Sequence, residues 1–307
     1  MTAPAFGGAG AGNSGTAAVT YDYPGPFSGG ELLIIFIEDA NEGVTPTPTP
    51  SGWTIVPGTP VGTGTAASTT ATAIRAYYKF AALGDTATFT LGDLGDHQAG
   101  QMLMFTGVDP TTPFDATAVT GTAATSTAVT FPSITTATNN ALVICAVANM
   151  FDSDTGQGSG FAHAGLSGIG SGNFNTSWGN GGGISYLYGA AATAGATGTG
   201  SCTLANTSVQ GLLTIALRPN QQTVETLTKM NAFAVMGGFD DKATLTKLGG
   251  FAVMGGFDDK ATLTKLGGFA VMGGFADQVT LTKLNAYAVI DATAPTVTAR
   301  PQIFVIT

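Results

Sequence analysis

Residues 245–290 read LTKLGGFAVMGGFDDKATLTKLGGFAVMGGFADQVTLTKLNAYAVI, and this stretch repeats itself every 18 residues. The motif Leu-Thr-Lys followed by Leu or Met returns once per repeat, as does an aromatic residue that opens Ala-Val-Met or Ala-Val-Ile. A fixed period over several copies is typical of repeat architectures, in which each copy stacks on the next. The motif begins at Leu227, Leu245, Leu263 and Leu281, and the aromatic residues are Phe233, Phe251, Phe269 and Tyr287.

Each repeat divides into three groups of six residues whose first position is apolar. A unit this short cannot bury its own apolar face, so copies must stack on one another or on copies from other chains. Two arrangements fit: a three-sided β-solenoid rung and an intertwined β-structured trimer. The positions expected to drive this assembly are Leu245, Phe251, Phe257, Leu263, Phe269, Phe275, Leu281 and Tyr287.

The composition of the whole chain predicts β structure as well. Only 9% of the 307 residues are charged, 45 are glycine, and threonine is abundant. Threonine favours strands, and short strands between Gly/Pro turns are typical of sandwiches and barrels. We therefore expect an all-β chain with an antiparallel β-sandwich of the jelly-roll or lectin-like kind, followed by a β-solenoid-like or intertwined repeat module. The candidate strands are residues 31–37, 74–80, 86–91, 100–105, 141–148, 183–188 and 212–217.

Changes in composition divide the chain into three parts. Residues 1–28 are rich in Gly and Ala and predict a flexible arm that an assembly would clamp, residues 29–220 the sandwich, and residues 221–307 the repeat module. The glycine-rich residues 156–183 indicate a surface excursion within the sandwich.

The charge distribution excludes two classes of partner. The net charge is −9, and Arg75 and Lys79 are the only basic residues before Arg218. An acidic surface repels phosphate backbones and anionic lipid, so we expect no nucleic acid as partner. The longest apolar run, residues 32–37, is far shorter than the roughly 18 residues of a spanning helix, so we expect no membrane insertion.

Candidate catalytic and metal-ligating residues form no recognisable constellation. His97 and His163 have no partner at ligand spacing and are interpreted as solvated loop residues. Acidic pairs suited to glycoside hydrolysis occur only where loops are expected, where acids usually face solvent; they are Glu38/Asp39/Glu42, Asp93/Asp96 and Asp152/Asp154. We therefore expect no enzyme, no metal and no cofactor. Cys145 and Cys202 fit either buried thiols or a single bridge.

Aromatic residues are the best candidates for a ligand site. Trp178 lies in the polar, glycine-rich stretch NTSWGN, and loops of this kind often carry binding residues. With Tyr186 and Trp53 it would form a platform for stacking on sugar rings. The alternative is that such residues belong to the core or rim of a β-sandwich.

Several short islands together resemble the β-sandwich domains of bacteriophage and prophage structural proteins. The segment LTKLNAYAVI at 281–290 likewise resembles short repeats in phage tail and appendage proteins. The islands are ELLII (31–35), PSGWT (50–54), YYKFA (77–81), TATF (86–89), FTGVDP (105–110), PFD (113–115), ALVI (141–144) and ALRP (216–219).

The resemblance implies a non-enzymatic virion protein on the particle surface, either a tail fibre or tail-associated protein or a capsid-decorating protein. Its partners would be other virion proteins and further copies of itself, with a trimer favoured. Two alternatives stay open: an adhesin that binds a host surface glycan, and a polysaccharide depolymerase.

Overall fold

The computed structural model describes two compact units, and the chain passes from the first to the second after Asn220. Thr2–Asn220 form the first unit and Gln221–Thr307 the second. The first is described at residues 2–44, 51–65, 70–83, 85, 88–177 and 181–220. In the second, the structure describes the backbone of the strands listed below. The described residues form strands and no helix, so none of them crosses a membrane as a helix.

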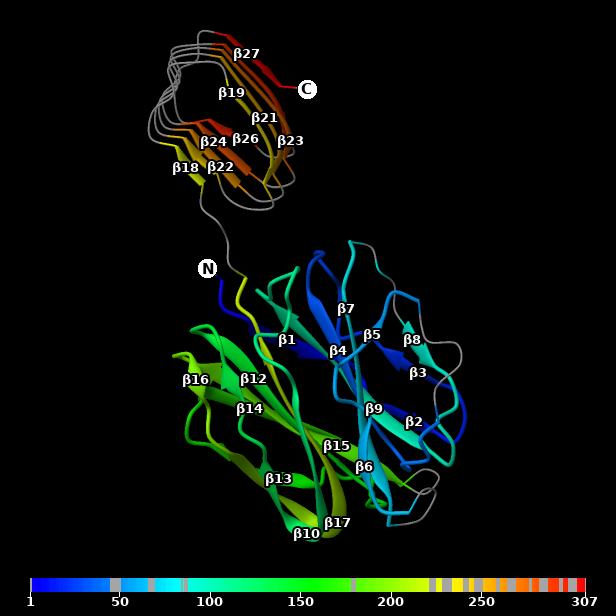
Figure 1. The fold of residues 1–307 in the computed structure, drawn as a ribbon. Coiled ribbons are helices and arrows are strands. Elements are labelled where there is room, and N and C mark those ends of the chain that lie inside the picture. Colours follow the sequence, from blue (N-terminus) through cyan, green and yellow to red (C-terminus); the bar gives the residue numbers. More distant parts are fainter. Residues whose placement is uncertain are drawn as a thin grey trace. The chain divides into compact units, whose positions relative to one another are not determined.

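The first unit is a β-sandwich-like arrangement of two antiparallel sheets (Figure 1). The first sheet runs in the order β1-β9-β4-β7-β5, with β2 also on β9 and β6 also on β7. Its strands are β1 (Ala5–Ala9), β2 (Asn13–Gly15), β4 (Leu32–Asp39), β5 (Thr54–Ile55), β6 (Val61–Thr63), β7 (Thr72–Phe80) and β9 (Gln98–Thr106).

The second sheet runs in the order β10-β17-β12-β15-β14, with β13 also paired to β17. Its strands are β10 (Val119–Phe131), β12 (Ala141–Asn149), β13 (Gly158–His163), β14 (Ser167–Thr176), β15 (Gly182–Ala191) and β17 (Gly200–Leu217). Two smaller sheets pair β3 (Val19–Asp22) with β8 (Thr88–Leu91) and β11 (Thr135–Thr136) with β16 (Gly195–Ala196).

The central strands are buried on both faces, which explains their continuous apolar sequences. Alternate residues of β4 point to opposite sides. Leu32, Ile34 and Phe36 join β12, β15 and β17 in the core between the sheets. Leu33, Ile35 and Ile37 pack instead beneath β3 and β8. The far side of β12 is covered in the same way by residues of β10 and by Cys202 and Leu204 of β17.

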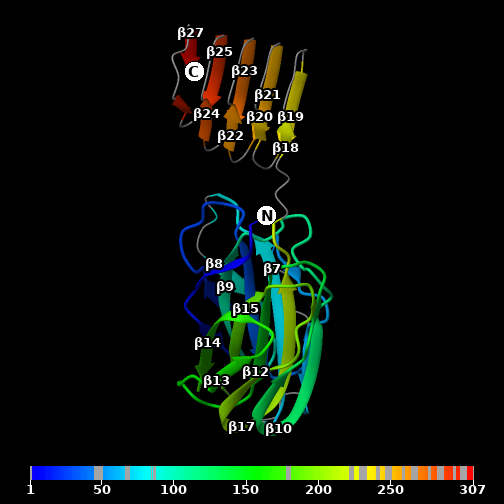
Figure 2. The ribbon, with the colours of Figure 1, turned by 90° about the vertical axis from the view of Figure 1, so that its left-hand side faces the viewer.

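The Gly/Ala-rich N-terminal segment, expected as an arm, forms strands of the first unit. β1 and β2 pair along β9, and β3 pairs with β8. Figure 1 labels these five strands, and Figure 2 shows β8 and β9 in the turned view. Glycine-rich composition favours flexible chain, but pairing with β9 holds Ala5–Ala9 and Asn13–Gly15 as strands.

The prediction of a surface excursion at residues 156–183 was wrong, because β13 and β14 lie there. The glycines of β14 have a packing reason. Gly170 and Gly172 stand opposite Tyr188 and Tyr186 in the ladder. A Cβ at either glycine would collide with the tyrosine across from it. The two tyrosine rings therefore take the space that side chains on β14 would need.

In the second unit, strands from successive repeats pair in parallel, in two five-stranded sheets. Each strand pairs with its counterpart one repeat on, so that Phe251 lies beside Phe269 and Leu245 beside Leu263. One sheet contains β18 (Glu225–Leu227), β20 (Ala243–Leu245), β22 (Lys260–Leu263), β24 (Gln278–Leu281) and β26 (Pro295–Val297). The other contains β19 (Ala234–Phe239), β21 (Phe251–Phe257), β23 (Phe269–Phe275), β25 (Tyr287–Ala292) and β27 (Ile303–Ile306).

The division of each repeat into three groups of six is not the division into strands. Phe251 and Phe257 open different groups, yet both lie in β21. Gly255 and Gly256, between them, continue the strand instead of turning it, since glycine permits a turn without imposing one. Each repeat thus contributes two strands among the described residues.

Candidate functional site

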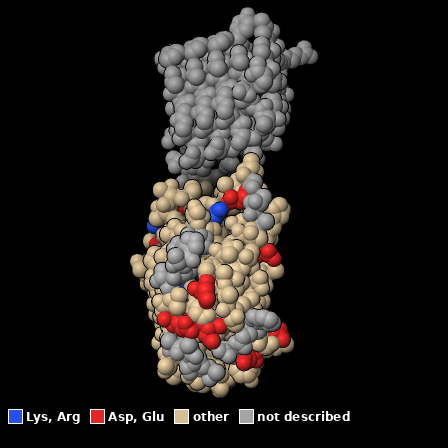
Figure 3. Space-filling model, turned by 90° about the vertical axis from the view of Figure 1, so that its right-hand side faces the viewer, with Lys and Arg blue, Asp and Glu red and all other residues tan. Residues whose placement is uncertain are grey.

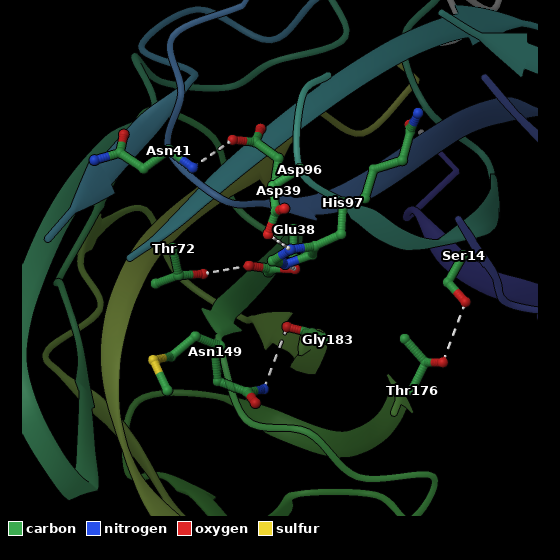
Figure 4. Close-up of polar contacts among 12 residues, drawn as sticks. Ser14, Glu38, Asp39, Asn41, Thr72, Asp96, His97, Asn149, Thr176 and Gly183 are labelled. Carbon is green, nitrogen blue, oxygen red and sulfur yellow. Dashed lines mark hydrogen bonds and ion pairs between the residues drawn. The ribbon is translucent and has the colours of Figure 1, made fainter. Parts of the chain in front are cut away.

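A cluster of charged side chains is buried at one end of the first sheet (Figure 4). Glu38 and Asp39 end β4, Arg75 belongs to β7, and His97 immediately precedes β9. The ladder aligns these elements, because Glu38 stands opposite Ile74 on one side and Ala99 on the other. Neighbouring strands therefore bring the acids of β4 beside the two bases.

His97 lies between two carboxylates. Its Nε2 is 3.0 Å from Oε2 of Glu38, and its Nδ1 is 3.5 Å from Oδ2 of Asp96. Thr72 Oγ1 donates a 2.9 Å hydrogen bond to the other oxygen of Glu38. Glu38 is 0% exposed and His97 3% exposed, so this pair is sealed from solvent.

Asp39 and Arg75 form a second buried pair beside the first. Arg75 Nε donates to Oδ2 of Asp39 over 3.1 Å, and the side chains are 4% and 1% exposed. The backbone N–H of Asn41 donates to the other oxygen of Asp39 over 2.9 Å. A buried charge is tolerated only where it is paired and hydrogen-bonded, as here.

Burial and pairing compete in setting the pKa values of this cluster. Burial raises the pKa of Glu38 to about 7, although the hydrogen bond and charge of His97 oppose the rise. Burial alone would lower the pKa of His97, but its interactions with Glu38 and Asp96 outweigh it and raise that pKa to about 9. The pKa of Asp39 is also raised by burial, with Arg75 acting against it. Glu38 and His97 therefore both hold their protons to a higher pH than they would in water.

A glycine of the second sheet, Gly182, lies against the charged cluster. A Cβ on Gly182, at the start of β15, would collide with the Glu38 carboxylate, and its φ of +118° is one that L side chains rarely adopt. Next to it, Asn149 Nδ2 donates to the carbonyl of Gly183 over 3.2 Å and Asn175 Nδ2 donates to Asn149 Oδ1 over 3.1 Å. The cluster therefore joins the two sheets, with the backbone of Gly182 lying against the Glu38 carboxylate.

These positions correct part of the sequence interpretation. His97 and His163 are 3% and 5% exposed and are not solvated loop residues. Glu38 and Asp39 lie in a strand, not in a loop. By contrast, Asp93, Asp152 and Asp154 are exposed as expected. In the part of the chain with described side chains, no three His, Cys, Asp or Glu residues are grouped to hold a metal ion.

The aromatic ligand candidates do not form a platform among the described residues. Trp53 is 9% exposed and packs edge-on against Phe89, with ring centroids 4.5 Å apart. Tyr186 is 4% exposed and lies in the core between the sheets. These positions favour the core interpretation for both residues. Trp178 lies outside the described residues.

Cys145 and Cys202 are free, buried thiols in the same apolar cluster. Burial raises the pKa of each to about 12, so neither is a ready nucleophile.

The acidic character expected from the sequence is visible at the surface of the first unit, where one face gathers Asp and Glu side chains (Figure 3).

Comparisons with protein-family models, characterised proteins and solved structures gave no match to this chain.

The positions expected to drive assembly of the repeats pair with one another or with an apolar residue of the next repeat. Leu263 pairs with Leu281, Phe257 with Phe275 and Tyr287 with Ile303.

The buried Glu38–His97 pair predicts a stability that falls as pH rises. Both pKa values exceed their ordinary ones, so the folded state holds more protons than the unfolded state between about pH 4.5 and 9. The contribution of His97 is full below its ordinary pKa and is lost as pH rises through about 9. We expect the free energy of unfolding, from urea titrations, to fall by roughly 4–6 kcal/mol between pH 5 and 9.5.

The variant Glu38→Gln removes one titrating group and the main partner of the other, so its profile should be much flatter. Asp154→Asn is the control, since the pKa of Asp154 is lowered by hydrogen bonds from Ser177 and its titration lies below this range. Burial lowers the pKa of His163, so its contribution to the free energy of unfolding rises with pH below about 6.5. This contribution is the same in wild type, Glu38→Gln and Asp154→Asn. An unchanged profile in Glu38→Gln would contradict the prediction.

Proposed function

We propose that this protein is a non-enzymatic structural component of a bacteriophage virion, a surface appendage of tail or capsid. The observation that carries the proposal is the parallel pairing of each repeat with the next through two five-stranded sheets, with the same residue type at most paired positions. Pairing of this kind extends a module one repeat at a time. A module of this kind suits a stalk or docking element, and the resemblance to phage appendage repeats supports the same role.

The first unit would be the display or binding domain, of jelly-roll or lectin-like topology. The repeat module would be a β-solenoid or an intertwined homotrimer, and it would attach to other virion proteins. The sealed Glu38–His97 pair supports a structural role, because a general acid or base must reach its substrate. Both groups are at most 3% exposed and are hydrogen-bonded within the domain.

A role in glycan binding would depend on Trp178. The exposed large hydrophobic residues among the described ones are Ile55, Leu83 and Ile169, none of them aromatic. Aliphatic side chains lack the flat face that stacks on a sugar ring.

Immunogold electron microscopy of intact phage particles tests the proposal, with an antibody raised against residues 30–218. We expect label on the particle surface, and pre-immune serum gives the background. Label on tail fibres would make host attachment the role of the first unit and Trp178→Ala the first variant for adsorption assays. Label on the head would make it a capsid-decorating protein. Particles that carry no label, from a lysate in which the antibody detects the free protein, would exclude a virion component.

A further inference from the structure

β9 is a strand that must be covered on its outer edge. It has no charged residue, and Met102, Leu103 and Phe105 on it are fully buried. An uncharged, apolar edge of this length pairs readily with other chains unless something covers it. In the first unit the cover is residues 5–15, since β1 and β2 together pair from Gln98 to Thr106.

The covering segment is anchored between the two sheets by one aromatic residue. The ring of Phe6 stacks on Tyr188 of β15, with centroids 4.4 Å apart and an interplanar angle of 21°. It also meets Phe105 of β9 edge-on at 5.9 Å. Further along, Ser14 Oγ donates to Thr176 Oγ1 of β14 over 3.2 Å. The segment thus closes the edge of the sandwich by contacts to both sheets.

The glycines of this segment make the fit specific. A Cβ at Gly12 would collide with the ring of Phe174, and one at Gly10 with the carbonyl of Asp22. A Cβ at Gly7 would lie 2.9 Å from Cε of Met104. A strand bound here must therefore be small at Gly10 and Gly12, and Phe6 supplies the aromatic ring that packs on Tyr188 and Phe105. Residues 5–15 meet these requirements, and so does the same segment of a second copy.

The partners of Phe6, Gly12 and Ser14 all lie beyond residue 97 and do not depend on the link to β3 at residues 16–18. We propose that residues 5–15 are an exchangeable strand, and that the β9 edge of one copy accepts this segment from a second copy. The contacts of residues 5–15 would be conserved in the exchange, which is the condition for low-cost strand swapping. The inference goes beyond the proposed function, since it holds for any assembly of this chain.

Disulfide trapping between two different variants tests the exchange. Ala5 and Thr106 face each other in the ladder and both are exposed. Chains with Ala5→Cys and chains with Thr106→Cys are unfolded together in urea, refolded as a mixture and oxidised with diamide. We expect a covalent dimer that joins the two variants, identified by peptide mass mapping, with a yield that rises with protein concentration towards the millimolar range.

Three controls make the result decisive. The double variant Ala5→Cys/Thr106→Cys should close within one chain, which shows that the geometry permits the bond. Wild type should give no dimer, since Cys145 and Cys202 are buried. Adding Phe6→Ala to the Ala5→Cys chain should leave the dimer yield nearly unchanged, because the contacts of Phe6 are lost equally in the closed and the exchanged form. A mixture that stays monomeric while the double variant closes would overturn the proposal.

Discussion

Replacing Arg75 by Met should lower the free energy of unfolding by about 3–5 kcal/mol, because it leaves the Asp39 carboxylate buried without its partner. Asp39 accepts from Arg75 Nε over 3.1 Å and is 1% exposed at its side chain. Arg75 is also the group that most opposes the effect of burial on the pKa of Asp39. Urea unfolding at pH 7 measures the loss.

The chain offers a matched control for this variant. Lys79 lies on the same strand and pairs with Asp85 over 2.9 Å, but these side chains are 18% and 24% exposed. Solvent screens such a pair, so Lys79→Met should cost less than about 1 kcal/mol. In the double variant Arg75→Met/Asp39→Leu no buried charge of the pair remains, and much of the stability should return. Equal losses for Arg75→Met and Lys79→Met would contradict the argument.

The strands that the sequence predicts best are those buried on both faces. The runs at 31–37 and 141–148 correspond to β4 and β12, since continuous apolar sequence is what a strand between two layers requires. The sequence could not show that β4 continues through Glu38 and Asp39. Two adjacent carboxylates at the end of an apolar run favour a loop unless their partners are known. Those partners, Arg75 and His97, come from other strands.

One signal could have pointed to the buried cluster. Arg75 stands within the predicted strand at 74–80, among apolar and aromatic residues, in a stretch of more than two hundred residues with only one other basic side chain. A cation inside a buried strand needs an acidic partner on a neighbouring strand. His97 carries no such signal, because its burial depends on how the segment before β9 packs.

The glycine-rich segments were the hardest to predict because their partners are distant in sequence. Residues 5–15 pair with β9, and Gly170 and Gly172 make room for tyrosines across the ladder. In both places the glycine accommodates a neighbouring strand or ring, whereas local composition indicates only flexibility. Strand identity there depends on tertiary contacts, as is usual for β structure.

Deleting one whole repeat should leave the second unit folded, whereas deleting half a repeat should disrupt it. Removal of residues 251–268 joins Gly250 to Phe269 and keeps every remaining strand opposite a counterpart of the same type. Removal of residues 251–259 instead places Lys260 after Gly250 and eliminates β21 alone, so that its neighbours β19 and β23 lose their shared partner. Because stability in repeat proteins comes from nearest-neighbour pairing, the shorter deletion is the more damaging.

Trypsin digestion of the full chain measures this difference, since all but two of the ten basic residues lie from Arg218 onward. Cleavage of a folded protein follows the population of its open form. We expect trypsin to cleave the whole-repeat deletion at a rate within about twofold of the wild-type rate. It should cleave the half-repeat deletion at least about tenfold faster than wild type. Circular dichroism of the surviving fragment shows whether the first unit is unaffected. If both deletions were cut equally fast, the 18-residue pairing register would not be what holds the module together.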